Sequence, residues 1–487
     1  MPRDAVSKKQ LDSLLGSAKE AADRILKTVE NREFIYVVSH LDADGLSAAG
    51  IVGKALARLG AIFRIRIERW LDEKVAGSIA ADKPDLIILA DFGSGNLDVL
   101  NRQLADNPLI ILDHHQITEE ASPTFVHVNP HLHEIDGSRD LSGAGVAYLV
   151  AKALNDANMD LAPIAVVGAL GDLQDKYSSR ELGGANKMIV EDAEATGGLR
   201  TETDLLFFGR ETRPIHKALA YTTVPFIPDI SGQEDRSVAF LASIGIAPKQ
   251  GDKWRALRDL SEEEKKKLCS ALAEHLASKG LSGNAALNLV GRVYTLVHEE
   301  PWTPLRDARE FSVLLNSTGR MGKGGVGVSI CMGDRGSALE DAEKVLDEYR
   351  STITKYLGWL TEKPGRLEEL NSIYVAHGEG IIDDKMIGTI SSILSTNLPK
   401  LEKPLIAYSA VSGEEFAKFS ARTMDLLVEK GLNLGEILKI AAEKYSGRGG
   451  GHNIAAGAQV PIKDVDMFIK LVDNLVKKQL EGRPLEG

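Results

Sequence analysis

The chain has 487 residues and a formal net charge of −12, and 43% of its residues are hydrophobic while only 5% are aromatic. This length is too great for a single hydrophobic core, so two or three domains are expected. The acidic balance argues against a protein wrapped generally in nucleic acid, although a local basic groove is compatible with it. The two cysteines lack metal-binding spacing, and no stretch approaches the roughly 18 apolar residues of a membrane span. We therefore expect a soluble cytoplasmic protein.

The first part of the chain, from about residue 34 to 200, alternates predicted strands with predicted helices. The apolar runs that predict strands are 35–38, 63–67, 86–90 and 109–112. Helices are predicted over 47–59, over 75–81 and from the N-cap Ser142 to about 154, whereas the apolar run 164–170 fits a helix or a strand. This alternation is typical of a doubly wound α/β domain with a parallel sheet, in which ligands bind at the carboxyl ends of the strands.

Strand signals thin out from about 200 to 305, which predicts a mainly helical middle region. Ser261 begins an S-x-x-E capping box at the start of a charged helix. The glycine-rich segment 319–325, which contains Arg320, predicts a turn, and a charged helix follows over about 339–357. Lys363-Pro364-Gly365 then indicates a boundary.

A smaller α/β unit is predicted after this boundary. Its strands are expected at 373–376, 405–409 and 415–421, and its helices at 385–398, at 433–444 and beyond Asp464. A glycine-rich segment, 447–452, lies before the last helix. The predicted division of the chain is therefore 1–200, 201–362 and 363–487.

Acidic and imidazole side chains follow three of the predicted strands. The groups at these strand ends are His40 with Asp42 and Asp44, then Asp91, then Asp113-His114-His115. Asp172, which follows the apolar run 164–170, is a fourth candidate. Taken singly, each motif is more often a turn, an ordinary strand end or a surface feature. Because all three fall at the carboxyl ends of predicted strands, the set predicts a shared metal site.

The donor types narrow the choice of metal. Carboxylates with imidazole select Mn²⁺ or Mg²⁺ and could accept Zn²⁺. No cysteine lies near these residues, which argues against a structural zinc site. The glycine after Asp44 permits a tight entry into the following helix.

Together these motifs resemble those of the DHH phosphoesterase superfamily. The segment Gly449-Gly450-Gly451-His452 resembles the signature of its accessory DHHA1 domain, and the resemblance covers about 34–180 and 370–460. Within the superfamily the chain is most similar to archaeal RecJ-like nucleases, including the GINS-associated nuclease. The resemblance implies a catalytic DHH domain, a middle insertion region and a substrate-binding DHHA1 domain, with a cleft between the DHH and DHHA1 domains.

The resemblance also implies roles for individual residues. Asp42 and Asp44 would ligate two Mn²⁺ ions, with Mg²⁺ as the alternative, and Asp91 would bridge them. His114 and Asp172 would complete the second metal position, and His40 is a further candidate ligand. Asp113 would orient the imidazole of His114, and His115 would face substrate phosphate. In the accessory domain, Arg422 and the Gly449–His452 segment would bind phosphate. Arg320, in the glycine-rich turn before that domain, is a further candidate. A solvated arginine and a flexible glycine loop are the alternatives for these positions.

The activity that the resemblance implies is hydrolysis of phosphodiester bonds in single-stranded nucleic acid to 5′-mononucleotides. Two ions would stabilise the attacking and leaving oxygens, so no serine or cysteine nucleophile is required. We favour a 5′→3′ DNA exonuclease of replication or repair. Alternatives are a 3′→5′ RNA exonuclease, a short-oligonucleotide or cyclic-dinucleotide phosphodiesterase, a family II pyrophosphatase, and a non-catalytic replisome scaffold. A GINS or replisome partner is expected from the resemblance alone.

Overall fold

The computed structural model describes residues 6–222, 227–279, 288–395, 402–411 and 413–483. The chain forms two compact units, residues 1–346 and 347–487, with the division inside helix α14 (Ser337–Glu362). The boundary expected at Lys363-Pro364-Gly365 lies just after the end of this helix. Among the described residues, no helix combines the length and apolar character that a membrane crossing requires.

The first unit is built on a five-stranded sheet in which every strand pair is parallel. The strand order is β2-β1-β3-β4-β5, where the bounds are β1 (Phe34–His40), β2 (Ile62–Glu68), β3 (Leu86–Ala90), β4 (Leu109–Leu112) and β5 (Phe125–Val128). The three central strands β1, β3 and β4 have fully buried interiors, because both faces of the sheet are covered. The predicted doubly wound parallel sheet is confirmed.

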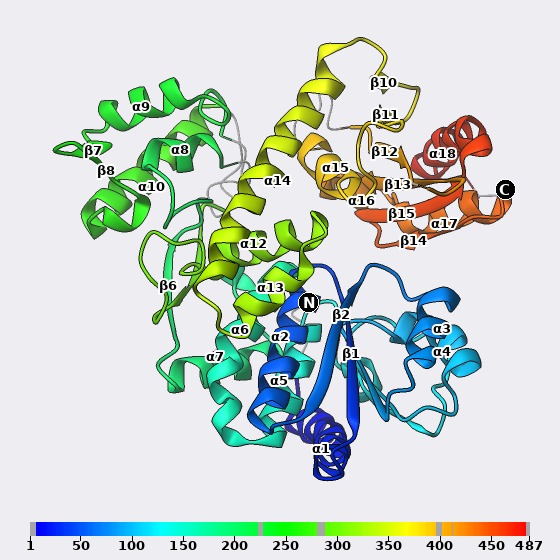
Figure 1. Ribbon diagram of the computed structural model, residues 1–487. Coiled ribbons are helices and arrows are strands. Elements are labelled where there is room, and N and C mark those ends of the chain that lie inside the picture. Colours follow the sequence, from blue (N-terminus) through cyan, green and yellow to red (C-terminus); the bar gives the residue numbers. More distant parts are fainter. Residues whose placement is uncertain (1–5, 223–226, 280–287, 396–401, 412, 484–487) are drawn as a thin grey trace. The chain divides into compact units, whose positions relative to one another are not determined.

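Helices cover the two faces of this sheet (Figure 1). On one face, α3 (Glu73–Ala81) and α4 (Leu97–Gln103) share a hydrophobic core with strands β1, β3 and β4. The other face carries α1 (Lys8–Glu30), α2 (Ala43–Arg58) and α5 (Gly143–Leu154). Helix α6 (Ala162–Gly171) packs against α2 and α5, with α7 (Asn186–Ala195) beside α6. The apolar run 164–170 is thus a helix, and Ser142 caps α5 as predicted.

The middle region is mainly helical but contains a strand pair that the sequence did not predict. Its helices include α8 (Ile215–Ala220), α9 (Glu234–Ser243) and α10 (Glu262–Ser278), and Ser261 forms the predicted capping box with Glu264. The unpredicted strands are β6 (Leu199–Leu205) and β9 (Val290–Leu296), which pair antiparallel over seven residues. A short hairpin lies between α9 and α10, and its strands β7 (Lys249–Gln250) and β8 (Lys253–Trp254) have two residues each.

Two further helices return to the first sheet domain. Helix α12 (Ala308–Arg320) packs against α6 and α2, and α13 (Gly324–Cys331) packs against α2. The turn predicted at 319–325 is shorter than expected, because Gly319 and Arg320 belong to α12 and Gly324 begins α13.

The second unit contains a six-stranded mixed sheet. Its order is β10-β11-β12-β13-β15-β14, where the bounds are β10 (Leu367–Glu369), β11 (Tyr374–His377), β12 (Leu405–Ala410), β13 (Phe416–Arg422), β14 (Arg448–Gly451) and β15 (Ala455–Pro461). Its helices are α15 (Ile387–Ser395), α16 (Asp425–Glu429), α17 (Leu434–Lys444) and α18 (Val465–Leu480). The core forms around Phe419 and Phe468, whose ring centroids are 4.5 Å apart. The helix predicted to 398 is described only to Ser395.

Candidate metal centre

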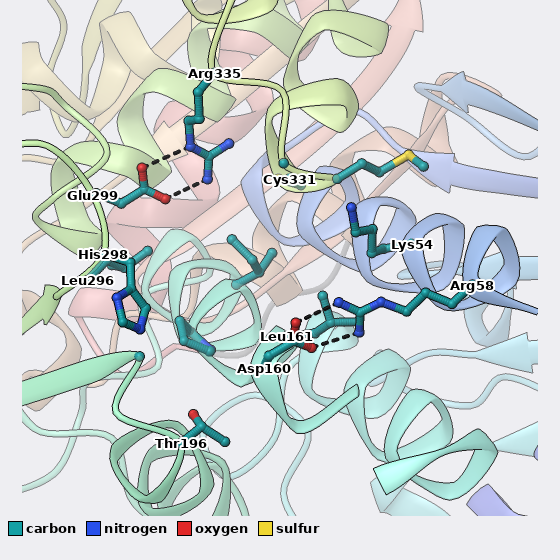
Figure 2. Close-up of a pocket in the computed structure, with 15 residues that line it drawn as sticks. Lys54, Arg58, Asp160, Leu161, Thr196, Leu296, His298, Glu299, Cys331 and Arg335 are labelled. Carbon is teal, nitrogen blue, oxygen red and sulfur yellow. Dashed lines mark hydrogen bonds and ion pairs between the residues drawn. The ribbon is translucent and has the colours of Figure 1, made fainter. Parts of the chain in front are cut away.

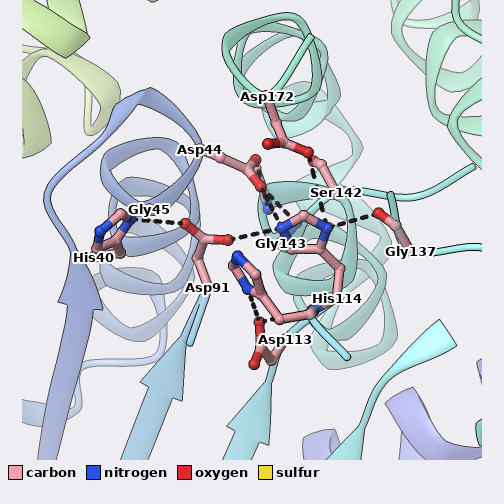
Figure 3. A network of polar contacts seen from close by, with 12 residues as sticks. His40, Asp44, Gly45, Asp91, Asp113, His114, Gly137, Ser142, Gly143 and Asp172 are labelled. Carbon is pink, nitrogen blue, oxygen red and sulfur yellow. Dashed lines mark hydrogen bonds and ion pairs between the residues drawn. The ribbon is translucent and has the colours of Figure 1, made fainter. Parts of the chain in front are cut away.

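The residues predicted to share a site meet at the carboxyl ends of β1, β3 and β4 (Figure 3). Ser39, near the end of β1, connects this strand to the start of α2 and to the end of β3. Its buried hydroxyl lies within hydrogen-bond distance of Gly45 O, at 2.7 Å, and of Ala90 O, at 2.9 Å. Asp42 then caps α2 by accepting from Gly45 N at 3.0 Å. Gly45 is required here, since a Cβ at this position would lie 2.4 Å from His40 O.

Asp44 points inward from the first turn of α2 and is held by the start of α5. Its two carboxylate oxygens accept from Gly143 N at 2.7 Å and from Ala144 N at 3.0 Å. These N–H groups belong to the first turn of α5 and have no partner within the helix, and a helix N-terminus favours a negative charge nearby. Even so, burial and the neighbouring Asp91 carboxylate raise the pKa of Asp44 well above its usual value. A cation at this position would relieve that repulsion.

Asp91 lies at the centre of the group and is 1% exposed. Its Oδ1 is 3.2 Å from His114 Nε2, and its Oδ2 is 3.7 Å from His40 Nδ1. Its backbone adopts φ of +61°, a left-handed conformation that aspartate tolerates better than most residues. Strain of this kind is found at functional sites, and here it turns the carboxylate toward the neighbouring strand end.

His114 is oriented by the backbone. Its Nδ1 lies 2.7 Å from Gly137 O, and because a carbonyl can only accept, Nδ1 carries the proton. Nε2 then faces the carboxylates of Asp91 and Asp44, at 3.2 and 3.6 Å. Both Nε2 and Asp91 Oδ1 are buried without a hydrogen-bond partner in the described chain.

Imidazole and carboxylate groups that converge in a buried site fit a divalent cation. Three overlapping sets of potential ligand atoms occur: His40, Asp42 and Asp91; Asp44, His114 and Asp172; and Asp91 with Asp113, His114 and His115. Burial alone would lower the pKa of His114, but Asp91, Asp172 and Asp44 raise it well above its usual value. The residues would therefore hold positive charge between them, whether as a proton or as a metal ion.

Asp113 and His115 occupy the edge of this group. Asp113 is fully buried and accepts from Ser94 N, from His114 N and from His115 Nδ1, each at 2.8 Å. The prediction that Asp113 orients the His114 imidazole is therefore wrong: its carboxylate orients the ring of His115, and Gly137 O orients the ring of His114. The side chain of His115 is 54% exposed. Burial alone would lower its pKa, but Asp113 raises it to about 9, so the ring is cationic at neutral pH.

Asp172 and His40 complete the predicted set. Asp172 caps the C-terminus of α6 rather than a strand, and its Oδ2 accepts from Gln174 Nε2 at 2.9 Å. His40 Nδ1 lies 3.0 Å from Asp42 Oδ2. Burial alone would lower the pKa of His40, but Asp42 and Asp91 raise it to about 10.

Helix α12 supports the loop that carries Asp42, which the sequence did not reveal. Asn316 Oδ1 accepts from Ala43 N at 3.1 Å. Gly319 packs so closely on the loop that an added Cβ would lie 1.6 Å from Leu41 O. Arg320, the last residue of α12, follows this contact directly. Nothing in the sequence around Asn316 indicates its contact with Ala43, which lies 273 residues away in the chain.

The C-terminal candidates lie in the second unit. Arg422 ends β13, and its guanidinium donates to Ser392 Oγ at 2.9 Å and to Ala421 O at 2.8 Å. The Gly449–Gly451 segment is not a loop but the edge strand β14, paired with β15, and His452 is exposed in the following turn. Two of the glycines have structural reasons. Close packing requires glycine at 449, where a Cβ would lie 2.4 Å from Leu438 O, and the backbone requires it at 451, where φ is +136°.

A separate cavity of about 340 Å³ lies around the C-terminal end of α2 (Figure 2). Two arginines in its wall are ion-paired, Arg58 with Asp160 and Arg335 with Glu299. None of the predicted site residues lines this cavity.

Comparisons with known proteins agree with the geometry. Three family domains match: the DHH family N-terminal domain over residues 34–170, the DHH-CID domain over 207–290 and the DHHA1 domain over 371–478. An uncharacterized protein of Methanocaldococcus jannaschii is 34% identical and matches over 97% of this chain and 98% of its own length. The single-stranded-DNA-specific exonuclease RecJ of Thermus thermophilus is 30% identical over 37% of this chain and 28% of its own length.

Solved structures show the same fold. The crystal structure of Thermus thermophilus RecJ with Mn²⁺ matches with a TM-score of 0.59 at 18% identity, over 98% of this chain and 56% of the RecJ chain. The crystal structure of CDC45 from Entamoeba histolytica matches with a TM-score of 0.61 at 11% identity, over 95% of this chain and 99% of the CDC45 chain. The chain belongs to the DHH family and has a RecJ-like arrangement of DHH, DHH-CID and DHHA1 domains.

Proposed function

We propose that the chain is a metal-dependent exonuclease that hydrolyses single-stranded nucleic acid, with DNA in the 5′→3′ direction favoured, to 5′-mononucleotides. The observation that carries the proposal is the buried cluster of potential ligands in which His114 Nε2 lies 3.2 Å from Asp91 Oδ1 and 3.6 Å from Asp44 Oδ2. RecJ relatives, named as single-strand-specific exonucleases, support the choice of substrate. Mn²⁺ is our first choice of metal and Mg²⁺ the second, because RecJ has been crystallised with each.

Asp42, Asp44, Asp91, His114 and Asp172 would hold two divalent ions, with His40 beside Asp42. Bound ions would supply Lewis acidity that activates water and stabilises the attacking and leaving oxygens. The protein's own groups prepare the site: the α5 N–H groups fix Asp44, Gly137 fixes the tautomer of His114, and Asp113 fixes His115. The exposed cationic ring of His115 is placed to bind a phosphate oxygen.

In the second unit we propose that Arg422 and the Gly449–His452 segment bind substrate phosphate. The support is the match to the DHHA1 domain and the partly accessible guanidinium at the end of β13. Arg320 is proposed as a further contact, since it follows the Gly319 contact with the Asp42 loop.

The test is a digestion of 5′- and 3′-labelled single strands of DNA and RNA with Mn²⁺. We expect mononucleotides released stepwise from one end. The isosteric change Asp91→Asn should abolish release, whereas Asp98→Asn, at a side chain of α4 that is 43% exposed, should not. Full activity in Asp91→Asn would contradict the proposal. Activity restricted to dinucleotides, cyclic dinucleotides or pyrophosphate would assign one of the alternative phosphoesterase reactions.

A second candidate function is a structural role in a replisome complex, with GINS as the partner to test. The similarity of fold to CDC45 favours it. The full set of potential ligands argues for catalysis, and the two roles are compatible. A wild-type protein that binds GINS but releases no nucleotide with Mn²⁺ would favour the structural role alone.

A further inference from the structure

A second polar feature lies beside the metal centre, on the two segments 137–140 and 172–177. Gly137 O accepts from His114 Nδ1 at 2.7 Å and from Gln174 Nε2 at 2.8 Å. The same Gln174 amide donates to Asp172 Oδ2, and Lys176 Nζ donates to Ser138 O at 2.9 Å. Both segments are therefore tied to each other and to two of the proposed ligands.

Arg139 and Tyr177 form a stacked pair on these segments. The Arg139 guanidinium carbon lies 3.9 Å from the centroid of the Tyr177 ring. The ring is fixed in place, because its hydroxyl donates to Asp140 Oδ1 and Gly183 packs so closely that an added Cβ would lie 2.4 Å from the ring. An arginine on a fixed aromatic platform loses little conformational freedom when it binds a ligand.

Arg139 has no carboxylate partner among the described residues. Its Nε is buried and makes no hydrogen bond in the described chain. Of the nearby carboxylates, Asp140 accepts from Tyr177, and Asp136 accepts from Ser138 N and Ser138 Oγ at 3.0 and 2.7 Å. In contrast, Arg64, which also lies over a tyrosine ring, is ion-paired with Asp82. In a chain of net charge −12, a fixed and unpaired guanidinium indicates an anionic ligand.

We propose that Arg139, supported by Tyr177, binds a backbone phosphate of the substrate strand next to the phosphodiester that is cut. This inference rests on the proposed function. Arginine can donate two N–H groups to the two nonbridging oxygens of a phosphodiester, and the remaining face of the guanidinium stays on the ring. Arg139 is thus a positioning residue that fixes the register of the strand over the metal centre.

The test measures binding without turnover. Labelled single-stranded oligonucleotides are titrated in EDTA by fluorescence anisotropy, with one phosphate at a time replaced by a neutral methylphosphonate. Wild-type protein should lose roughly ten- to hundredfold in affinity when the phosphate that Arg139 contacts is neutral. Arg139→Ala should bind the unmodified strand more weakly by the same factor. Its affinity should not fall further when the same phosphate is replaced by methylphosphonate. Arg64→Ala is the matched control and should respond as wild type does.

Salt dependence gives a second measurement. Loss of one phosphate contact should reduce the slope of log K against log salt by about 0.7 for a single strand. The inference is overturned if Arg139→Ala matches wild type in affinity, in salt slope and in its response to each methylphosphonate. The proposed function would still stand in that case, provided that wild-type protein digests the strand with Mn²⁺. If wild-type protein neither binds nor digests any strand, the proposed function fails, and this inference fails with it.

Discussion

Gly143 gives the sharpest structural test of the metal centre. It is the first residue of α5, and a Cβ added to it would lie 2.3 Å from Asp91 Oδ1 and 2.8 Å from Asp91 Cγ. Comfortable contacts between nonbonded heavy atoms begin near 3.5 Å, so Gly143→Ala must displace the Asp91 carboxylate by about 1 Å. Displacements of this size cost about a hundredfold in rate, and misplaced ligands lower metal affinity by roughly ten- to hundredfold.

We therefore expect Gly143→Ala to bind Mn²⁺ at least tenfold more weakly, as measured by electron paramagnetic resonance of free Mn²⁺. The added Cβ would also lie 2.7 Å from Asp91 Cβ, so the variant should lose some stability, and a urea titration first establishes that it is folded. The matched control is Gly77→Ala in α3, where an added Cβ meets no atom within 4 Å. A folded Gly143→Ala protein with wild-type Mn²⁺ affinity would refute the reasoning that Asp91 is a ligand held in place by α5.

Two further predictions concern α12. Burial and Asp307 raise the pKa of Glu310 from 4.5 to about 7. Between these two pH values the native protein keeps a proton that the unfolded chain has lost. The free energy of unfolding should therefore fall by up to roughly 3 kcal/mol as pH rises from 4.5 to 7. Glu310→Gln should remove this fall in urea titrations; an unchanged pH profile would contradict it. Asn316→Ala should lower the free energy of unfolding by about 1 kcal/mol and weaken Mn²⁺ binding several-fold, because the hydrogen bond from Ala43 N is lost. The control is Asn101→Ala, which loses a similar hydrogen bond from Ser122 N and should leave Mn²⁺ binding intact.

The sequence predicted that these residues would lie together because their positions follow from strand ends. His40, Asp91 and Asp113 each terminate or follow an apolar strand, and parallel strands bring such positions to one edge. Asp172 was found by the same pattern although it follows a helix. The run before it is apolar on all sides because α6 is buried all around, so its periodicity could not distinguish a helix from a strand.

Other features depend on contacts between distant segments, which a single sequence does not show. The strand Leu199–Leu205 has an exposed, polar centre, and its pairing with Val290–Leu296 decides its conformation. The glycines at 449–451 suggested a loop, yet close packing on Leu438 and Ala456 explains two of them as members of an edge strand. The support that Gln174 and Gly137 give to His114 also depends on such a contact.

Helix α12 connects the middle region to the metal centre through two sets of contacts. Near its N-terminus, Glu310 accepts from Glu211 N at 2.9 Å and from the Thr212 hydroxyl. Near its C-terminus, Asn316 accepts from Ala43 N. Because α12 contacts both residues 211–212 and the loop that carries Asp42, we predict that a displacement at residues 211–212 alters that loop. If the middle region binds a partner or a strand of nucleic acid, this helix offers a direct structural route by which that binding would alter metal affinity, and the Glu310 and Asn316 substitutions test its two ends separately.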